Sequence, residues 1–136
     1  MTKKKKTETD NKGIKVYHNY LIIAIGTLFA VYAGAILLSI NLYQVGKKKM
    51  IWIVIPLSMI YAASEQIALN YYGIITVPMT FIINLIGIFL LIIMFWDNKF
   101  QTKEKISYRS IWIPLLIAII IWGPWYLNFI KNYILN

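Results

Sequence analysis

Long stretches without Lys, Arg, Asp or Glu constrain the fold of this chain more than any other feature. They cover residues 17–46, 50–64, 66–96 and 110–130. A soluble helical bundle carries charged residues on its outer helix faces, so its sequence is interrupted by charges every few residues. A helix needs roughly 20 apolar residues to cross a bilayer. The pattern therefore predicts an all-α, polytopic membrane protein.

The lengths of these stretches predict four transmembrane helices in an antiparallel bundle. The expected spans are about 17–43, 50–72, 74–96 and 110–133, within a single transmembrane domain at residues 16–136. Residues 1–15 are polar and lysine-rich, and we expect a disordered basic tail there. The first apolar stretch continues past the small residues 33–35, so it is longer than a signal-peptide core, and we expect it to be retained.

The second span contains a single formal charge, Glu65, which lies within an otherwise apolar helix. At 100° per residue, one narrow face of this helix carries its polar and small residues, namely Ser58, Tyr61, Glu65, Ala68 and Tyr72. An acidic side chain at membrane depth costs roughly 2.5–3.5 kcal/mol on insertion scales. Desolvation disfavours the ionised carboxylate, so we expect Glu65 to be protonated part of the time.

The third span carries a matching stripe of Thr76, Thr80, Asn84 and Gly87 at helical spacing. Polar groups that faced lipid would lack hydrogen bonds, so the stripe should face other helices. Two interpretations of Glu65 are open. It is either a site for a proton, an ion or a ligand, or a protonated side chain that holds the bundle together by bonding to Asn84, Thr80 or a tyrosine. The predicted ion or ligand site comprises Glu65, Asn84, Thr80, Tyr61 and His18.

His18 is included because four antiparallel spans would place the start of the first span in the same half of the bundle as Glu65. Gly123 and Pro124 should interrupt the fourth span, and broken helices line solute paths in transporters. We therefore expect a small proton- or cation-linked transporter or channel-like bundle. The alternative is an accessory or regulatory subunit of a larger membrane complex.

Gly26, Ala30 and Gly34 recur at intervals of four residues and predict a groove for close helix packing. The groove would serve packing within one chain or contact in a homodimer. The sequence does not favour an enzyme, because the chain has one histidine, no cysteine and no second acid within its apolar stretches. We expect no cofactor and no metal cluster.

The net charge of +9 comes from tails and loops and forms no nucleic-acid-binding pattern, so anionic lipid headgroups are the expected partners of the lysine loops. Four spans would leave seven Lys and Arg on each side: Lys3, Lys4, Lys5, Lys6, Lys12, Lys15 and Lys131 against Lys47, Lys48, Lys49, Lys99, Lys103, Lys105 and Arg109. The positive-inside rule then gives no bias. We expect both termini to be cytoplasmic in the cell membrane, with insertion in both orientations as an antiparallel dimer as the alternative.

Overall fold

The computed structural model describes residues 13–73, 77–96 and 106–134, and these residues form five helices and two short strands. In chain order the elements are β1 (Ile14–Val16), α1 (Asn19–Leu28), α2 (Val31–Gln44), α3 (Lys48–Tyr72), α4 (Val77–Phe95), β2 (Ile106–Tyr108) and α5 (Trp112–Ile134). The prediction of a helical protein is confirmed. The strand pair was not predicted.

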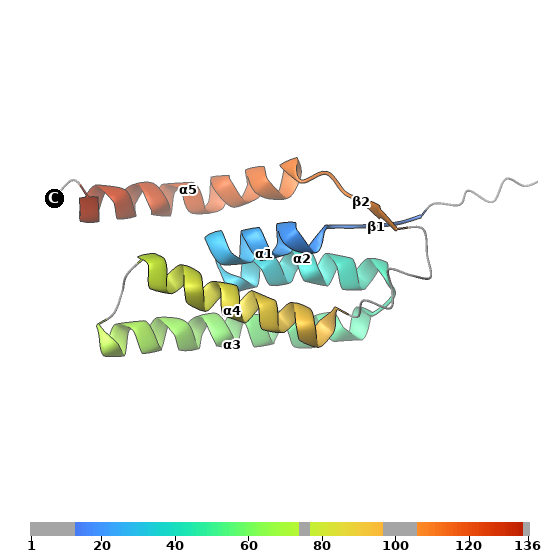
Figure 1. The fold of residues 1–136 in the computed structure, drawn as a ribbon, viewed down its shortest axis with the longest axis horizontal. Helices are drawn as coiled ribbons and strands as arrows, with labels where there is room; N and C mark the ends of the chain where they lie inside the picture. The colour runs from blue at the N-terminus through green and yellow to red at the C-terminus, as the bar shows by residue number, and fades with distance from the viewer. Residues whose placement is uncertain (1–12, 74–76, 97–105, 135–136) are drawn as a thin grey trace, which may run out of the picture.

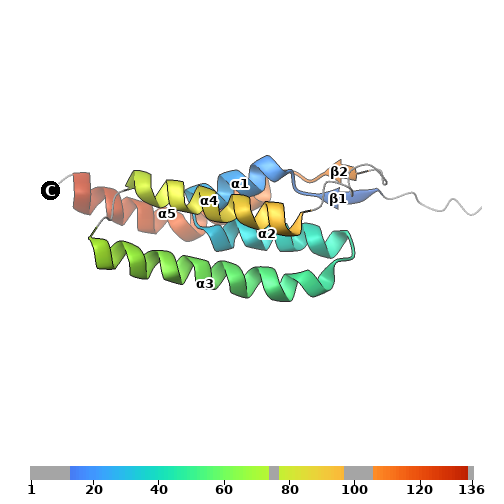
Figure 2. The same cartoon turned by 60° about the horizontal axis from the view of Figure 1, so that its bottom comes forward.

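The helices lie nearly parallel to one long axis (Figure 1). α3 and α4 run antiparallel, the short α1 and α2 cover them, and α5 lies beyond α1 and α2 (Figures 1 and 2). Contacts between α2 and α3 and between α1 and α4 join the layers. The core consequently lies around the α1–α2 pair.

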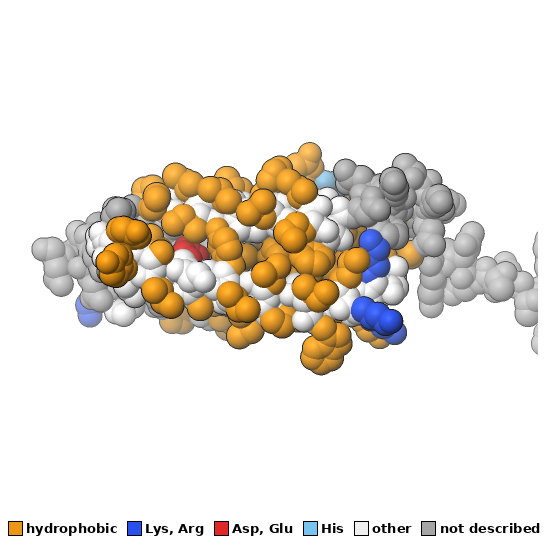
Figure 3. All heavy atoms as spheres, turned by 90° about the horizontal axis from the view of Figure 1, so that it is seen from below, with side chains coloured by type: hydrophobic (Ala, Val, Ile, Leu, Met, Phe, Trp, Pro, Cys, Tyr) orange, Lys and Arg blue, Asp and Glu red, His pale blue; other side chains and the backbone are white. Residues whose placement is uncertain are grey.

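Two helices, α3 and α4, are long and apolar enough to cross a membrane. Only 17% of the most apolar part of α3 and 28% of that of α4 is buried within the molecule, whereas the core helix of a soluble protein would be mostly buried. Trp52 of α3, for example, is 83% exposed. Figure 3 shows the resulting apolar surface over both helices. These features indicate association with a membrane.

The predicted first span, 17–43, is two helices rather than one. α1 ends at Leu28, the chain reverses at Phe29 and Ala30, and α2 returns to the end where α1 began. With 10 residues, α1 is about 15 Å long, half the roughly 30 Å hydrocarbon core of a bilayer. The prediction of a single helix is wrong because the two halves of the stretch pack on each other.

Gly26 and Gly34 allow this reversal. Each lies four residues from Ala30 along the sequence, so the two glycines meet across the turn. A Cβ atom at Gly34 would lie 2.9 Å from both Gly26 Cα and Ile22 O. Ile88 of α4 fills the same junction, 2.6 Å from the Cβ position of either glycine. Small residues permit such close approach of helix backbones. The predicted groove is thus filled by contacts within the hairpin and with α4.

The end of the hairpin is tied to a short parallel sheet. β1 pairs with β2 in the register Ile14 to Ile106, and the Arg109 N–H donates to Val16 O. Asn41 in α2 accepts from the Tyr17 N–H and donates to the Tyr17 carbonyl, both at 2.7 Å. The expected disordered tail 1–15 therefore includes an ordered strand, and residues 1–12 lie outside the described residues.

α5 is continuous through Gly123 and Pro124, so the predicted interruption of the fourth span is wrong. Proline removes one backbone hydrogen bond, at a cost of about 3 kcal/mol. Unwinding the helix would remove several backbone hydrogen bonds rather than one. A continuous helix is thus the less costly arrangement.

α5 contacts the hairpin through Trp122, whose ring centroid lies 5.8 Å from that of Phe29 and 5.7 Å from that of Tyr32.

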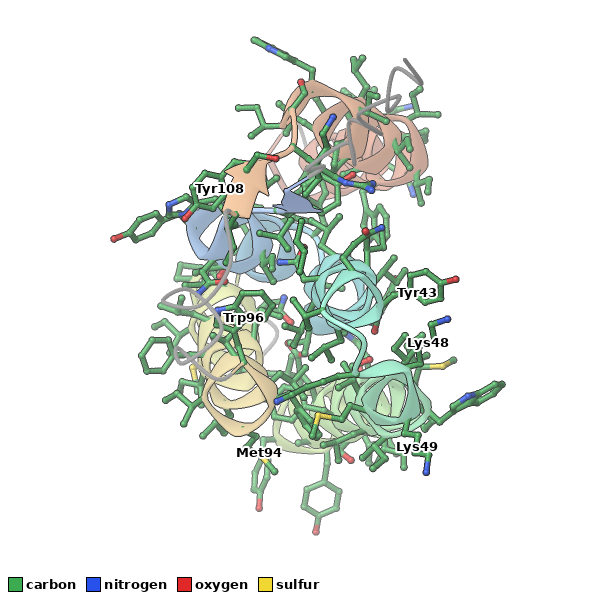
Figure 4. All side chains as sticks on the ribbon, turned by 90° about the vertical axis from the view of Figure 1, so that its right-hand side faces the viewer. Tyr43, Lys48, Lys49, Met94, Trp96 and Tyr108 are labelled. Atoms are coloured by element: carbon green, nitrogen blue, oxygen red, sulfur yellow. The ribbon has the colours of Figure 1, made fainter. Side chains whose placement is uncertain are left out.

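Basic residues gather at the end of the bundle where the sheet lies (Figure 3). Among described residues, this end has Lys15, Lys47, Lys48, Lys49 and Arg109, and the far end has Lys131. Figure 4 shows Lys48 and Lys49 at this end, extending to different sides of the start of α3. Lys48 Nζ lies 4.6 Å from the Tyr43 ring centroid. The even division expected from four spans is overturned, because the hairpin returns the chain to its starting end.

Candidate functional site

The site is built on a contact between Tyr61 of α3 and Gly87 of α4. A Cβ atom at Gly87 would lie 2.5 Å from Tyr61 Cε1, so only glycine leaves room for this ring. The Tyr61 hydroxyl donates a 2.8 Å hydrogen bond to Ile83 O. The polar stripes predicted for the two helices do meet here.

Glu65 and Asn84 lie one turn beyond this contact, and on the same side of it. Since α3 and α4 are antiparallel, moving from Tyr61 to Glu65 and from Gly87 to Asn84 proceeds in both cases toward the far end. Side chains tilt toward the N-terminus of their own helix, which brings these two closer in depth. Glu65 is 8% exposed and Asn84 is 4% exposed. Two buried polar side chains consequently occupy one layer of the bundle.

Each of these two side chains has a buried oxygen without a hydrogen bond. Among the residues that the structure describes, Glu65 Oε1 and Asn84 Oδ1 have no hydrogen-bond partner. A buried acceptor without a partner costs roughly 1–3 kcal/mol, and native structures contain few of them.

The polar residues near this layer differ in burial. Thr80 is half-buried, Thr76 lies outside the described residues, and Ala68 and Tyr72 are exposed. The predicted face of α3 is thus buried at Ser58 and Glu65 and half-buried at Tyr61, but it is exposed in its last two turns, where the short hairpin does not reach (Figure 1).

His18 is not part of this site. It caps α1 at the basic end by accepting from the Tyr20 N–H at 3.3 Å. Its ring lies 4.6 Å from that of Tyr20 and 4.8 Å from that of Tyr108. Glu65 lies in the other half of α3, seven residues before Tyr72. The expected proximity of His18 to Glu65 is wrong, because it depended on a first span that crosses the membrane in one direction.

The turn of the hairpin closes one side of the Glu65 layer, a role that the sequence interpretation missed. Val31, the first residue of α2, lies 2.9 Å from the Cβ position of Gly87, where the Tyr61 ring also packs. The detectable signal is the symmetric placement of two glycines about Ala30. Val31, Tyr61 and Gly87 together form a layer, the closing layer, between Glu65 and the basic end.

The chemistry of the site is that of oxygen acceptors in an apolar bundle. Within residues 13–73, 77–96 and 106–134, no three His, Cys, Asp or Glu side chains come together, so these residues form no site of the kind that binds zinc. Carboxylate and amide oxygens suit hard cations and hydrogen-bond donors. The arrangement can accept a proton, a water molecule or a small cation.

Comparisons of the chain with protein families, with curated proteins and with solved structures find no match. Function is accordingly inferred from the residues of the site and their surroundings.

Proposed function

We propose that this protein is a small transporter or channel-like membrane protein in which Glu65 binds a proton or a cation. The observation that carries the proposal is the unpaired Oε1 of Glu65, buried in the same layer of the bundle as the unpaired Oδ1 of Asn84. Ionisable residues are rare at membrane depth and usually have a functional role. The proposal explains why the acid is kept there.

The proposed topology has three crossings, by α3, α4 and α5, and one hairpin, α1–α2, that enters and leaves on the same side. The sheet end has five of the six described basic residues, and segments 1–12 and 97–105, which continue the chain from this end, contain the other eight of the fourteen Lys and Arg. The positive-inside rule then makes this end cytoplasmic.

Cysteine labelling tests this orientation directly, since the chain has no cysteine. In intact cells, an impermeant maleimide should label Asn70→Cys and leave Lys48→Cys and Ser110→Cys unlabelled until the membrane is opened. All three positions are exposed. Labelling of Lys48→Cys and Asn70→Cys from the same side would contradict the crossing of α3. Equal labelling of all three from both sides would establish insertion in both orientations.

Replacing Glu65 tests the function itself. In proteoliposomes with an imposed membrane potential, Glu65→Gln should reduce proton or sodium flux, read with pH- and sodium-sensitive dyes, at least about tenfold. Glutamine keeps the shape and hydrogen-bonding capacity of the side chain but cannot ionise. Ser64→Ala is the matched control, because Ser64 is exposed on the same helix, and it should retain the flux. A wild-type protein without flux, or a Glu65→Gln variant with normal flux, would contradict the proposal.

The arrangement of α5 favours the second candidate function, an accessory subunit of a larger complex. α5 exposes a run of large apolar side chains along its length: Ile113, Leu116, Ile117, Ile120 and Ile121. It contacts the hairpin through Trp122. Such a helix can pack against another membrane protein as readily as against lipid. Co-purification of a stoichiometric membrane partner, lost on disruption of α5, would support this alternative.

A further inference from the structure

We propose that the Glu65–Asn84 layer binds a monovalent metal cation of the alkali series. This inference rests on the proposed function and specifies its ligand. Two buried oxygens on facing helices, Glu65 Oε1 and Asn84 Oδ1, lack hydrogen-bond partners among the described residues. Alkali cations bind through oxygen lone pairs alone, which is what these atoms offer.

The charge of the site selects a monovalent ion. Glu65 is the one acidic residue within residues 13–73, 77–96 and 106–134, and Asn84 is neutral. One carboxylate neutralises one positive charge. A divalent ion would leave an uncompensated charge inside an apolar bundle, where such a charge is strongly unfavourable. An anion would be repelled by the negative charge of the Glu65 carboxylate.

The surroundings of the site give it access from one side. Toward the basic end, the closing layer of Val31, Tyr61 and Gly87 is tightly packed, and beyond it lies the junction of Gly26, Gly34 and Ile88. Glu65 lies on the other side of the closing layer, in the half of the bundle away from the sheet. We infer that the ion enters from that half.

A single proton offers a simpler way to satisfy both oxygens, since protonated Glu65 could donate to Asn84 Oδ1. The two cases respond differently to salt. A bound metal ion stabilises the folded protein increasingly as its concentration rises, whereas the stability of a protonated pair does not depend on which alkali ion is present. Glu65→Gln separates them further, because the glutamine amide can donate to Asn84 but carries no charge to hold an ion.

Thermal unfolding of the full chain in lipid nanodiscs, followed by fluorescence of its five tryptophans, tests the proposal. The probes are NaCl, LiCl and KCl at pH 8, each compared with choline chloride at equal ionic strength. We expect at least one alkali salt to raise the Tm of the wild-type protein by about 3 °C or more. The rise should vanish in Glu65→Gln and shrink in Asn84→Leu. Gln66→Ala, at an exposed neighbour, should behave as wild type.

Equal Tm values of the wild-type protein in choline chloride and in all three alkali salts would overturn the cation site. A rise of Tm in alkali salt that is as large in Glu65→Gln as in the wild-type protein would overturn it too. The flux assay keeps this failure distinct from failure of the proposed function. Proton flux that depends on Glu65 without any alkali shift would keep the proposed function and remove the metal ion. An alkali shift that depends on Glu65 in a protein without flux would keep the ion site and remove transport.

Discussion

Gly34→Ala should destabilise the protein by about 3 kcal/mol, near the upper end of what overpacking of a core costs. The new methyl group would lie 2.6 Å from Ile88 Cδ1 and 2.9 Å from Gly26 Cα and Ile22 O. The isoleucine side chain can move, but the two backbone atoms belong to α1 and can yield only if the hairpin opens. Chemical unfolding in detergent, followed by tryptophan fluorescence, measures the change.

Gly123→Ala is the matched control for this substitution. Gly123 also lies within a helix, and nothing lies within 4 Å of its Cβ position. Alanine favours helix over glycine by about 1 kcal/mol, so this variant should be neutral or more stable. If Gly34→Ala and Gly123→Ala had similar stabilities, the close contact of α1 with α2 would be incorrect.

Asn41→Leu should cost about 3 kcal/mol, since it leaves two buried backbone groups of Tyr17 without partners. Asn41 is 0% exposed, and both of its hydrogen bonds to Tyr17 are 2.7 Å long. Leucine has a similar volume but neither a donor nor an acceptor. The β1 strand, which ends one residue before Tyr17, should detach from α2 as a result, and faster hydrogen exchange at Tyr17 and at Arg109 would report this detachment.

Ser39→Ala provides the comparison in the same helix. Ser39 is also buried, but its Oγ has no hydrogen-bond partner, so removal of the hydroxyl sacrifices no bond. Stability should stay the same or rise. A loss for Ser39→Ala equal to that for Asn41→Leu would show that polarity in α2, rather than the link to Tyr17, determines stability.

The central helices could be predicted from sequence because their signal is local. The apolar stretches 50–72 and 74–96 correspond closely to α3 and α4, and the burial of Glu65 and Asn84 follows from the facing polar stripes. The hairpin could not be predicted from the length of the apolar stretch, since residues 17–43 are enough to cross a bilayer in one pass. Its reversal depends on tertiary contact between Gly26, Gly34 and Ile88.

The error about the first span explains two further errors, those about the position of His18 and about the division of the basic residues. A first span that crosses would bring His18 into the half that holds Glu65 and would divide the basic residues evenly. A stretch that returns does neither. The sheet was missed for a related reason. Its strands alternate apolar and polar residues but have only three residues each, which is too short for this pattern to identify a strand.

The parallel sheet also dictates an order of events during biosynthesis. Ile14 and Ile106 are separated by 92 positions, so β1 leaves the ribosome long before its partner strand exists. Asn41 is only 24 residues from Tyr17 and becomes available much sooner. Because contacts that are close in sequence form first, the asparagine can hold the N-terminal strand in place while α3 and α4 are made. β2 then pairs with a strand whose position is already fixed.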